Sequence, residues 1–123
     1  MIAVIFEVCP HAASKPDYLA TAAALAPLLK DMDGFISIER FQSLSDPARI
    51  LSLSFWRDEA AVAAWRNTPA HREAQAAGRA HIFSDYRLRI AAVIRDYGLT
   101  ERDEAPADSR RAHASAACPF HPK

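Results

Sequence analysis

The sequence predicts an α+β fold in which strands and helices follow one another in the order β-α-β-β-α-β. Three observations support this prediction. A continuous apolar segment opens the chain, two alternating segments near its middle are joined by a turn sequence, and a further alternating segment begins near residue 85. The stretches between them have the apolar spacing and start signals of helices. The length of 123 residues fits one domain, because two separate cores would each be too small.

The first third of the chain predicts a strand followed by one helix. Residues 1–8 are almost wholly apolar and β-branched or aromatic, which is typical of a strand buried on at least one face. Ser14 and Asp17 have a spacing like that of a capping box and predict the helix start. Gly34 predicts its end, and Pro27 predicts a kink or a local break. Apolar residues at intervals of three and four form its predicted buried stripe: Tyr18, Ala22, Leu25, Leu29 and Met32.

The middle of the chain predicts a β-hairpin. Residues 35–44 and 49–56 both alternate, and Ser45-Asp46-Pro47 between them is a turn sequence. Alternation divides the first of these strands into two faces. One face is expected to carry Ile36, Ile38, Arg40 and Gln42, and the other Phe35, Ser37, Glu39 and Phe41.

Two helices and a last strand complete the predicted order. Asp58 is expected to cap a short helix over residues 58–66, and Thr68-Pro69 to start another that runs to about residue 80. Residues 85–97 predict the final strand, and the whole order is that of the split βαβ, or ferredoxin-like, arrangement. One face of that strand is expected to carry Tyr86, Leu88, Ile90, Ala92 and Ile94.

The predicted domain covers residues 1–97. From residue 98 to residue 123 the apolar periodicity vanishes and Pro, Asp and Arg interrupt the chain, which predicts an extended or disordered C-terminal tail. A sheet with helices on one face leaves its other face bare. Because large apolar residues occupy both sides of the first and last strands, we expect a second copy to cover that face, forming a homodimer.

Composition and charge disfavour several classes of function. Fifteen Lys and Arg residues balance fifteen Asp and Glu residues, so no long-range field favours nucleic acid or an anionic membrane. No apolar window reaches the roughly 18 residues of a membrane span. The N-terminus lacks the basic start of a secretory signal, and we expect a cytoplasmic protein. Cys9 and Cys118 formally allow one disulfide, but free thiols are the simpler expectation.

An aromatic and polar cluster is the best candidate for a functional site. Trp56 closes a strand, Trp65 ends the short helix, and His71 lies in the first turn of the next helix, where the helix dipole favours a neutral imidazole. A neutral imidazole can act as a base. The simpler alternative is that both tryptophans belong to the core and His71 caps its helix. Gln75 and Gly78 share a helix face with His71, and Gly78 would leave room for a bound molecule, whereas Arg72 equally fits a solvated face.

Charged residues on the hairpin provide a second candidate. Glu39 and Arg40 lie on opposite faces of one strand, so one of them must point inward, either at a cavity or at the dimer partner. A structural salt bridge is the simpler interpretation. Glu39 is retained as a candidate substrate-binding residue.

Cofactor and metal signals are sparse. The sequence contains no G-x-G-x-x-G, Walker, G-x-S-x-G or H-E-x-x-H motif, so flavin or nicotinamide binding in the usual folds is unsupported. His113, Cys118 and His121 could ligate zinc or heme iron, but a zinc site needs a fourth ligand, and no metal site is predicted.

The first 97 residues resemble the antibiotic biosynthesis monooxygenase (ABM) domain family. The resemblance rests on the order and spacing of several segments rather than on one diagnostic motif. It implies a dimeric α+β barrel whose subunits are ferredoxin-like, with a pocket between sheet and helices. The matching segments are residues 1–8, Gly34–Arg40, Leu53–Trp56, Asp58–Ala60, and Trp65-Arg66 with His71-Arg72.

The resemblance implies two kinds of chemistry. One branch of the family oxidises phenolic polyketides to quinones without a cofactor, using a strand tryptophan, an arginine and a further polar residue; Trp56, Arg72 and Ser52 match these. The other branch degrades heme. Trp65 fits its tryptophan, but the iron-ligating histidine falls near Gln75, and the first strand offers Phe6 or Glu7 where that branch has asparagine.

We therefore expect a monooxygenase that oxidises a small aromatic or polycyclic substrate with O2, without a metal or flavin. In this hypothesis His71 assists proton removal and Arg72 stabilises the resulting anion. Heme binding or degradation is one alternative, and a non-catalytic dimeric protein that binds a small ligand is another, since fold alone does not separate them. The residues expected to contact the substrate are Ser52, Trp56, Trp65, Gln75 and Glu39.

Overall fold

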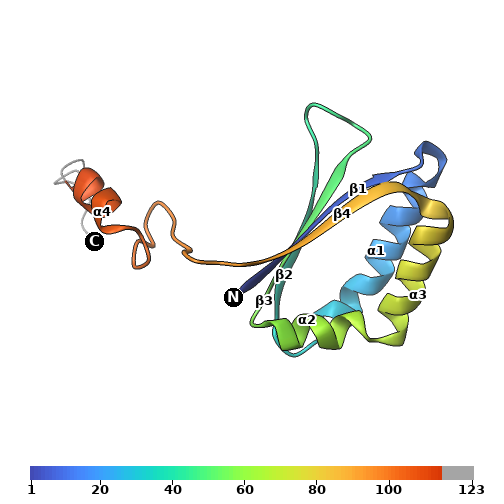
Figure 1. Cartoon of the computed structure of the whole chain (residues 1–123), viewed down its shortest axis with the longest axis horizontal. Helices are drawn as coiled ribbons and strands as arrows, with labels where there is room; N and C mark the ends of the chain where they lie inside the picture. The colour runs from blue at the N-terminus through green and yellow to red at the C-terminus, as the bar shows by residue number, and fades with distance from the viewer. Residues whose placement is uncertain (115–123) are drawn as a thin grey trace. The chain divides into compact units, whose positions relative to one another are not determined.

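The computed structural model describes residues 1–114 and confirms the α+β prediction. Four antiparallel strands form one sheet in the order β2-β3-β1-β4, and helices α1, α2 and α3 all lie on the same face of it (Figure 1). Two short turns flank the first and third helices: the 3-10 turn η1 and the π-helical turn η2. The elements are β1 (Ile2–Pro10), η1 (Ala12–Ser14), α1 (Lys15–Lys30), β2 (Phe35–Gln42), β3 (Ile50–Trp56), α2 (Glu59–Arg66), α3 (Pro69–Ala77), η2 (Gly78–Ile82), β4 (Phe83–Ala92) and α4 (Ala107–Ala114).

The core beneath the helices consists of two separate clusters. One surrounds Trp56, which is 2% exposed, and includes Leu29 from α1 and Trp65 from α2. The other contains Val8, Tyr18, Ile50 and Ile82. The predicted stripe of α1 supplies residues to both clusters, because Tyr18 lies near its start and Leu29 near its end.

The faces of β2 differ from the predicted alternation at its first residues. A bulge lies between Phe35, which pairs with Trp56, and Ser37, which pairs with Phe55. The extra residue places the Phe35 ring on the helix side, in edge contact with Trp56 at 5.2 Å between centroids. Ile36 is exposed as a result. From Ile38 onward the alternation follows the prediction.

Helix α1 differs from the prediction in two details. Ser14 is the N-cap residue of this helix, as predicted, but it also belongs to η1, already has helical backbone angles, and makes no capping hydrogen bond with its side chain. Its hydroxyl instead donates to the His81 carbonyl at 3.4 Å. Pro27 was predicted to kink or break the helix, yet α1 continues through it to Lys30. Pro27 and Ala23 are both exposed, so water can satisfy the Ala23 carbonyl that loses its partner.

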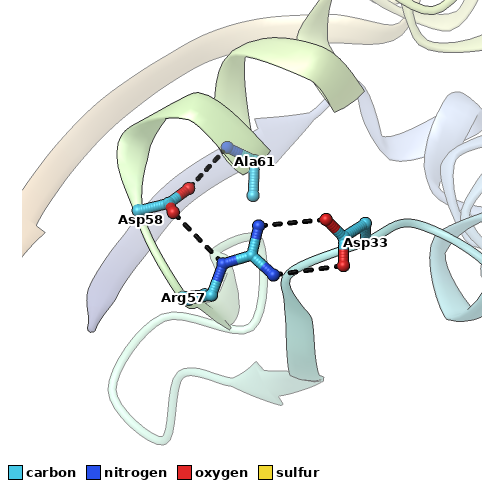
Figure 2. A network of polar contacts seen from close by, with 4 residues as sticks. All are labelled: Asp33, Arg57, Asp58 and Ala61. Carbon is cyan, nitrogen blue, oxygen red and sulfur yellow. Dashed lines mark hydrogen bonds and ion pairs between the residues drawn. The ribbon is translucent and has the colours of Figure 1, made fainter.

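An arginine joins the α1–β2 turn to the start of α2 (Figure 2). The Arg57 guanidinium donates two hydrogen bonds to Asp33, each 3.1 Å, and a third to Asp58. These bonds lower the pKa of Asp33, and the Ala61 backbone N–H is the main cause that lowers the pKa of Asp58. Asp58 caps α2 through that N–H at 2.9 Å, as predicted.

Gly34 is required where the same two segments meet. Its φ of 86° is in the left-handed region, and an added Cβ would stand 2.6 Å from the Ala61 Cβ. Helix α1 itself ends at Lys30, four residues before Gly34, with Asp31 as its C-cap. Gly34 therefore shapes the turn into β2 rather than ending the helix directly.

Helix α3 and strand β4 both end earlier than predicted. Thr68 caps α3 as predicted, but α3 ends at Ala77 and η2 continues to Ile82. Strand β4 ends at Ala92, which pairs with Ile2, the first residue of β1. Beyond that point β4 has no neighbouring strand, so the alternation of the next residues does not extend the sheet. In residues 1–114 no helix is long and apolar enough to cross a membrane.

A second compact unit begins at Val93, whereas the sequence predicted a domain up to residue 97 and an extended or disordered tail from residue 98. Within it, Glu104 accepts the Asp96 N–H at 2.6 Å, and the Arg102 guanidinium lies over the Tyr97 ring at 5.1 Å. The unit also contains α4, a helix absent from the sequence prediction. Its His113 is described, but Cys118 and His121 lie outside the described residues; within residues 1–114 no three metal-binding side chains cluster, and Cys9 is a free thiol.

Candidate active site

One cavity of about 210 Å³ lies between the sheet and the helices. Members of both core clusters line it, including Tyr18, Leu29, Trp56 and Ile82. Cavities of about 150 Å³ can hold benzene, so this volume suits a small ring-sized molecule. The cavity extends along β4, where three of the lining residues are still 37–46% exposed: Tyr86, Leu88 and Ile90. We infer that its mouth lies beside β4.

Small polar residues on the central strand β3 help to keep this space open. Ser52 and Ser54 are only 7% and 6% exposed, and both line the cavity between the larger Ile50 and Trp56. The Ser54 hydroxyl accepts a hydrogen bond from the Trp56 indole N–H at 2.9 Å. That bond satisfies the buried indole and fixes the tryptophan as a wall of the cavity.

His71 projects into the cavity from the first turn of α3. The Thr68 hydroxyl, which caps α3, accepts the His71 backbone N–H at 3.3 Å, and the imidazole meets the Trp65 ring edge to face at 5.3 Å. Burial is the main cause that lowers the pKa of His71, and the charges of Arg72 and Arg66 add to it; a hydrogen bond with the Arg66 backbone opposes them. The imidazole is therefore neutral at pH 7.

One nitrogen of this imidazole has no hydrogen-bond partner in the described part of the chain. His71 Nδ1 is buried and has no hydrogen-bond partner among the described residues. A buried polar atom without a partner is rare in folded proteins and indicates either a ligand site or a functional role. His71 lines the cavity, and a neutral imidazole can accept a proton from a molecule bound within its reach.

The structure brings together five of the seven residues proposed from the sequence. Ser52, Trp56, Trp65, His71 and Gln75 all line the cavity.

Arg72 and Glu39 are not among the residues that line the cavity. Arg72 is exposed and donates to Asn67 at 2.6 Å and to Gln75 at 3.4 Å. Glu39 pairs with Leu53 on the uncovered face of the sheet and is exposed. Successive residues of a helix or strand point in different directions, which separates Arg72 from His71 and Glu39 from Arg40.

Gly78 lines the cavity as expected, but a protein side chain uses the space that it leaves. The Phe83 ring lies where a Gly78 Cβ would be, so an alanine would collide with it. Phe83 in turn contacts the rings of Phe6, Tyr18 and Tyr86, with centroids 5.7–5.9 Å apart. Gly78 thereby allows an aromatic wall to form at this end of the cavity.

Three arginines of the cavity lining were absent from the candidate residues. Arg40 comes from β2, Arg66 from α2 and Arg79 from η2; Arg66 and Arg79 are exposed, while Arg40 Nε is buried and without a partner among residues 1–114. The signal for Arg40 was present, because it shares the inward face with Ile38. None of the ion pairs among the described residues includes Arg40 or Glu39, so the salt bridge offered as the simpler interpretation is not formed within this part of the chain.

Comparison with known sequences identifies relatives of this domain. The sequence model of the antibiotic biosynthesis monooxygenase family matches residues 1–77. The jasmonate monooxygenase ABM of Pyricularia oryzae is 48% identical over 93 residues, which are 76% of this chain and 43% of that protein. The Bacillus subtilis protein YqjZ is 30% identical over 78 residues, which are 63% of this chain and 67% of that protein. The chain thus spans less than half the length of the Pyricularia relative.

Solved structures share the fold at low sequence identity. A putative antibiotic biosynthesis monooxygenase from Deinococcus radiodurans superposes with a TM-score of 0.73 at 15% identity, covering 81% of this chain and 99% of that one. The Rv0793 protein of Mycobacterium tuberculosis gives a TM-score of 0.71 at 16% identity, covering 79% and 98%. The ferredoxin-like arrangement predicted from the sequence is confirmed.

Proposed function

Because the chain belongs to the antibiotic biosynthesis monooxygenase family, we propose that it oxidises a small aromatic or polycyclic substrate with O2 in the cavity above the sheet. The observation that carries this proposal is that a neutral His71, whose buried Nδ1 has no partner, lines the cavity beside Trp65. The substrate itself supplies the electrons, and no metal or flavin is needed. Trp56 and Trp65 shape the space in which it lies.

The proposed reaction starts with proton transfer to His71. The imidazole accepts the phenolic proton, and the resulting phenolate is electron-rich enough to reduce O2. A new C–O bond forms at a ring carbon, whose hydrogen is lost. One oxygen atom of O2 becomes the second quinone oxygen, and the other leaves as water with the two hydrogens, so a phenol and O2 give a quinone and H2O. Gln75 and Ser52 line the cavity and can hydrogen-bond the substrate oxygens.

The position of Arg72 changes its proposed role. Arg72 is not among the cavity-lining residues, and its guanidinium donates to Asn67 and to the cavity-lining Gln75, so it acts on a substrate only through Gln75. We expect Arg72→Ala to reduce the rate by less than His71→Ala does. Heme degradation has less support, because Gln75 takes the position of the iron-ligating histidine and Phe6 lines the cavity where that chemistry needs an amide.

We propose that the uncovered face of the sheet forms a homodimer. Apolar Ile5, Leu53 and Phe55 lie there, since their neighbours in each strand line the cavity. The same face carries acidic Glu39 on β2 and basic Arg87 on β4. Because it carries both signs of charge, this face can be complementary to the same face of a second copy. We expect a total buried area of roughly 1,500 Å² or more.

The test is oxygen uptake by the purified full chain with a panel of naphthols and anthrones, without added metal, flavin or reductant. We expect one O2 consumed per quinone formed, and one atom of label from ¹⁸O2 in the product. His71→Ala should lower the rate by about 10²- to 10⁴-fold. Jasmonate, which appears in the name of the Pyricularia relative, should be assayed with and without a reductant. Full turnover by a folded His71→Ala protein would contradict the assignment of the base.

A hemin titration separates the alternatives. Tight binding of one heme per subunit, followed by release of an oxidised tetrapyrrole when a reductant is added, would replace the proposed reaction with heme degradation. Ligand binding without any oxygen uptake across the whole panel would favour a non-catalytic binding protein.

A further inference from the structure

The cavity lining carries positive charge that the proposed oxidation does not use. Among the described residues that line it there are three arginines and no aspartate or glutamate. None of these arginines takes part in an ion pair within residues 1–114. A confined space lined by one sign of charge raises the local concentration of ligands of the opposite sign.

The register of the sheet places one of these arginines at the end of a row of side chains. Arg40 of β2 pairs with Ser52 of β3, Ser52 pairs with Phe6 of β1, and Phe6 pairs with Leu88 of β4. All four residues line the cavity, so the row crosses its floor from strand to strand. With neighbouring strands about 4.8 Å apart, it spans about 14 Å.

The polarity of this row changes in one direction. It begins with a guanidinium, continues with a hydroxyl and a phenyl ring, and ends with an aliphatic residue that is 46% exposed at the β4 side. The adjacent cavity-lining row carries no charge: Ile38, Ser54, Val4 and Ile90.

Two hydrogen-bond donors at the charged end lack partners in the protein. Arg40 Nε is buried, and no described residue accepts its hydrogen. Ser52 is 7% exposed, and its hydroxyl makes no hydrogen bond to any residue in the described part of the chain, in contrast to the Ser54 hydroxyl, which accepts from Trp56. Arg40 lines the cavity, and its guanidinium has no ion-pair partner among the described residues. A carboxylate is the ligand group that fits the fork of guanidinium N–H donors.

We infer that the cavity binds an amphipathic monocarboxylate, whose carboxylate contacts Arg40 and Ser52 and whose apolar body lies over Phe6 toward Leu88. This inference rests on the proposed function, because it names the substrate class of the same cavity. The mainly apolar lining favours a single negative charge over a dianion, since each further charge would have to be desolvated there. Exposed Arg66 and Arg79, which also line the cavity, guide the anion inward.

Binding of two matched probes to the full-length protein tests the inference. The probes are 3-phenylpropionate and 3-phenylpropionamide, which have nearly the same shape and differ in charge. Titration calorimetry under nitrogen measures binding alone. We expect the carboxylate to bind at least about tenfold more tightly than the amide, because charge-assisted hydrogen bonds are the stronger ones.

Variants assign this preference to the charged end of the row. Arg40→Met should remove the preference for the carboxylate, Arg40→Lys should keep part of it, and Ser52→Ala should reduce it. Arg49→Met is the matched control, since Arg49 is exposed and is not among the cavity-lining residues. Circular dichroism checks that each variant is folded; if Arg40→Met does not fold, the ratio measured for Arg40→Lys and Ser52→Ala decides.

Three results would overturn the inference: equal affinity for the two probes, an unchanged preference in folded Arg40→Met, or no binding of 3-phenylpropionate at millimolar concentration. Failure of this inference and failure of the proposed oxidation give different results. A carboxylate preference without oxygen uptake would contradict the monooxygenase proposal alone, whereas oxidation of neutral phenols without a carboxylate preference would contradict this inference alone.

Discussion

The two faces of strand β3 differ in what they carry and in how they are covered. On the helix side, four residues are at most 7% exposed although two of them are serines: Ile50, Ser52, Ser54 and Trp56. On the other side, the larger apolar residues Leu51, Leu53 and Phe55 are only half-buried. The covered face therefore carries small polar groups inside the protein, and the uncovered face carries apolar groups near its surface.

This difference indicates that the two faces have different roles. Polar residues weaken a core unless they are satisfied, so Ser52 on the covered face is best explained by a ligand in the cavity. Apolar residues on an uncovered face are best explained by a protein partner. One strand thereby contributes one set of residues to the proposed substrate site and the alternate set to the proposed subunit contact.

The largest effect is expected for Trp56→Ala on the covered face. The side chain is 2% exposed, and deletion of a buried tryptophan costs about 3–5 kcal/mol of unfolding free energy, which urea titration measures. Phe41→Ala on β2 is the control, because Phe41 is 42% exposed. Equal losses in the two variants would contradict the contrast between the faces.

Leu53→Asp tests the uncovered face. A charge in the centre of the proposed contact should weaken dimerisation at least about 100-fold, or about 2.8 kcal/mol, because the carboxylate must be desolvated without a partner. Sedimentation velocity measures the dissociation constant. Leu44→Asp makes the same substitution at a fully exposed turn position and should leave the constant unchanged. A folded wild-type monomer at micromolar concentration would show that the apolar face needs another explanation.

Gly34→Ala tests how closely the helical layer is joined to the sheet. The positive φ alone costs about 1–2 kcal/mol for alanine, and the new Cβ would also press against Ala61. Thermal unfolding should show a clear loss of stability. Gly98→Ala provides the comparison, since Gly98 has no positive φ and an added Cβ there meets no atom within 4 Å. A Gly34→Ala protein as stable as wild type would mean that this turn can rearrange.

The smallest effect is the pH dependence of stability that His71 contributes on the covered side. Its pKa is lowered in the folded protein from an unfolded value near 6.5, mainly by burial, so the unfolded chain binds the proton more readily. Stability should therefore fall as the pH drops from about 6.5 toward the folded-state pKa and should level off below it. Urea titrations from pH 7.5 to 4.5 should show a smaller decrease for His71→Gln. An identical decrease in both proteins would place the titrating group elsewhere.

Features that depend on a few neighbouring residues could be predicted from the sequence. The caps Asp58 and Thr68 form as predicted, because an N-cap needs only its own side chain and the first turn of its helix. The α+β element order follows from alternation and helical spacing in the same local way. The cluster of Trp56, Trp65 and His71 was predictable because each residue lies near an end of its strand or helix, and these ends follow one another closely in the sequence. All three residues line the cavity.

Features that depend on contacts between distant segments were decided by the tertiary structure. Strand β4 stops where β1 begins, Phe35 turns inward through a bulge against β3, and the Ser14 hydroxyl contacts the His81 carbonyl instead of a backbone N–H of α1. The same holds for the site. Alternation determined that either Glu39 or Arg40 faces inward, but only the packing of helices over one face of the sheet selected Arg40, buried its Nε and aligned it with Ser52. Local sequence determines which side chains share a face, whereas the register between strands and the layer above them determines which of those side chains meet a ligand.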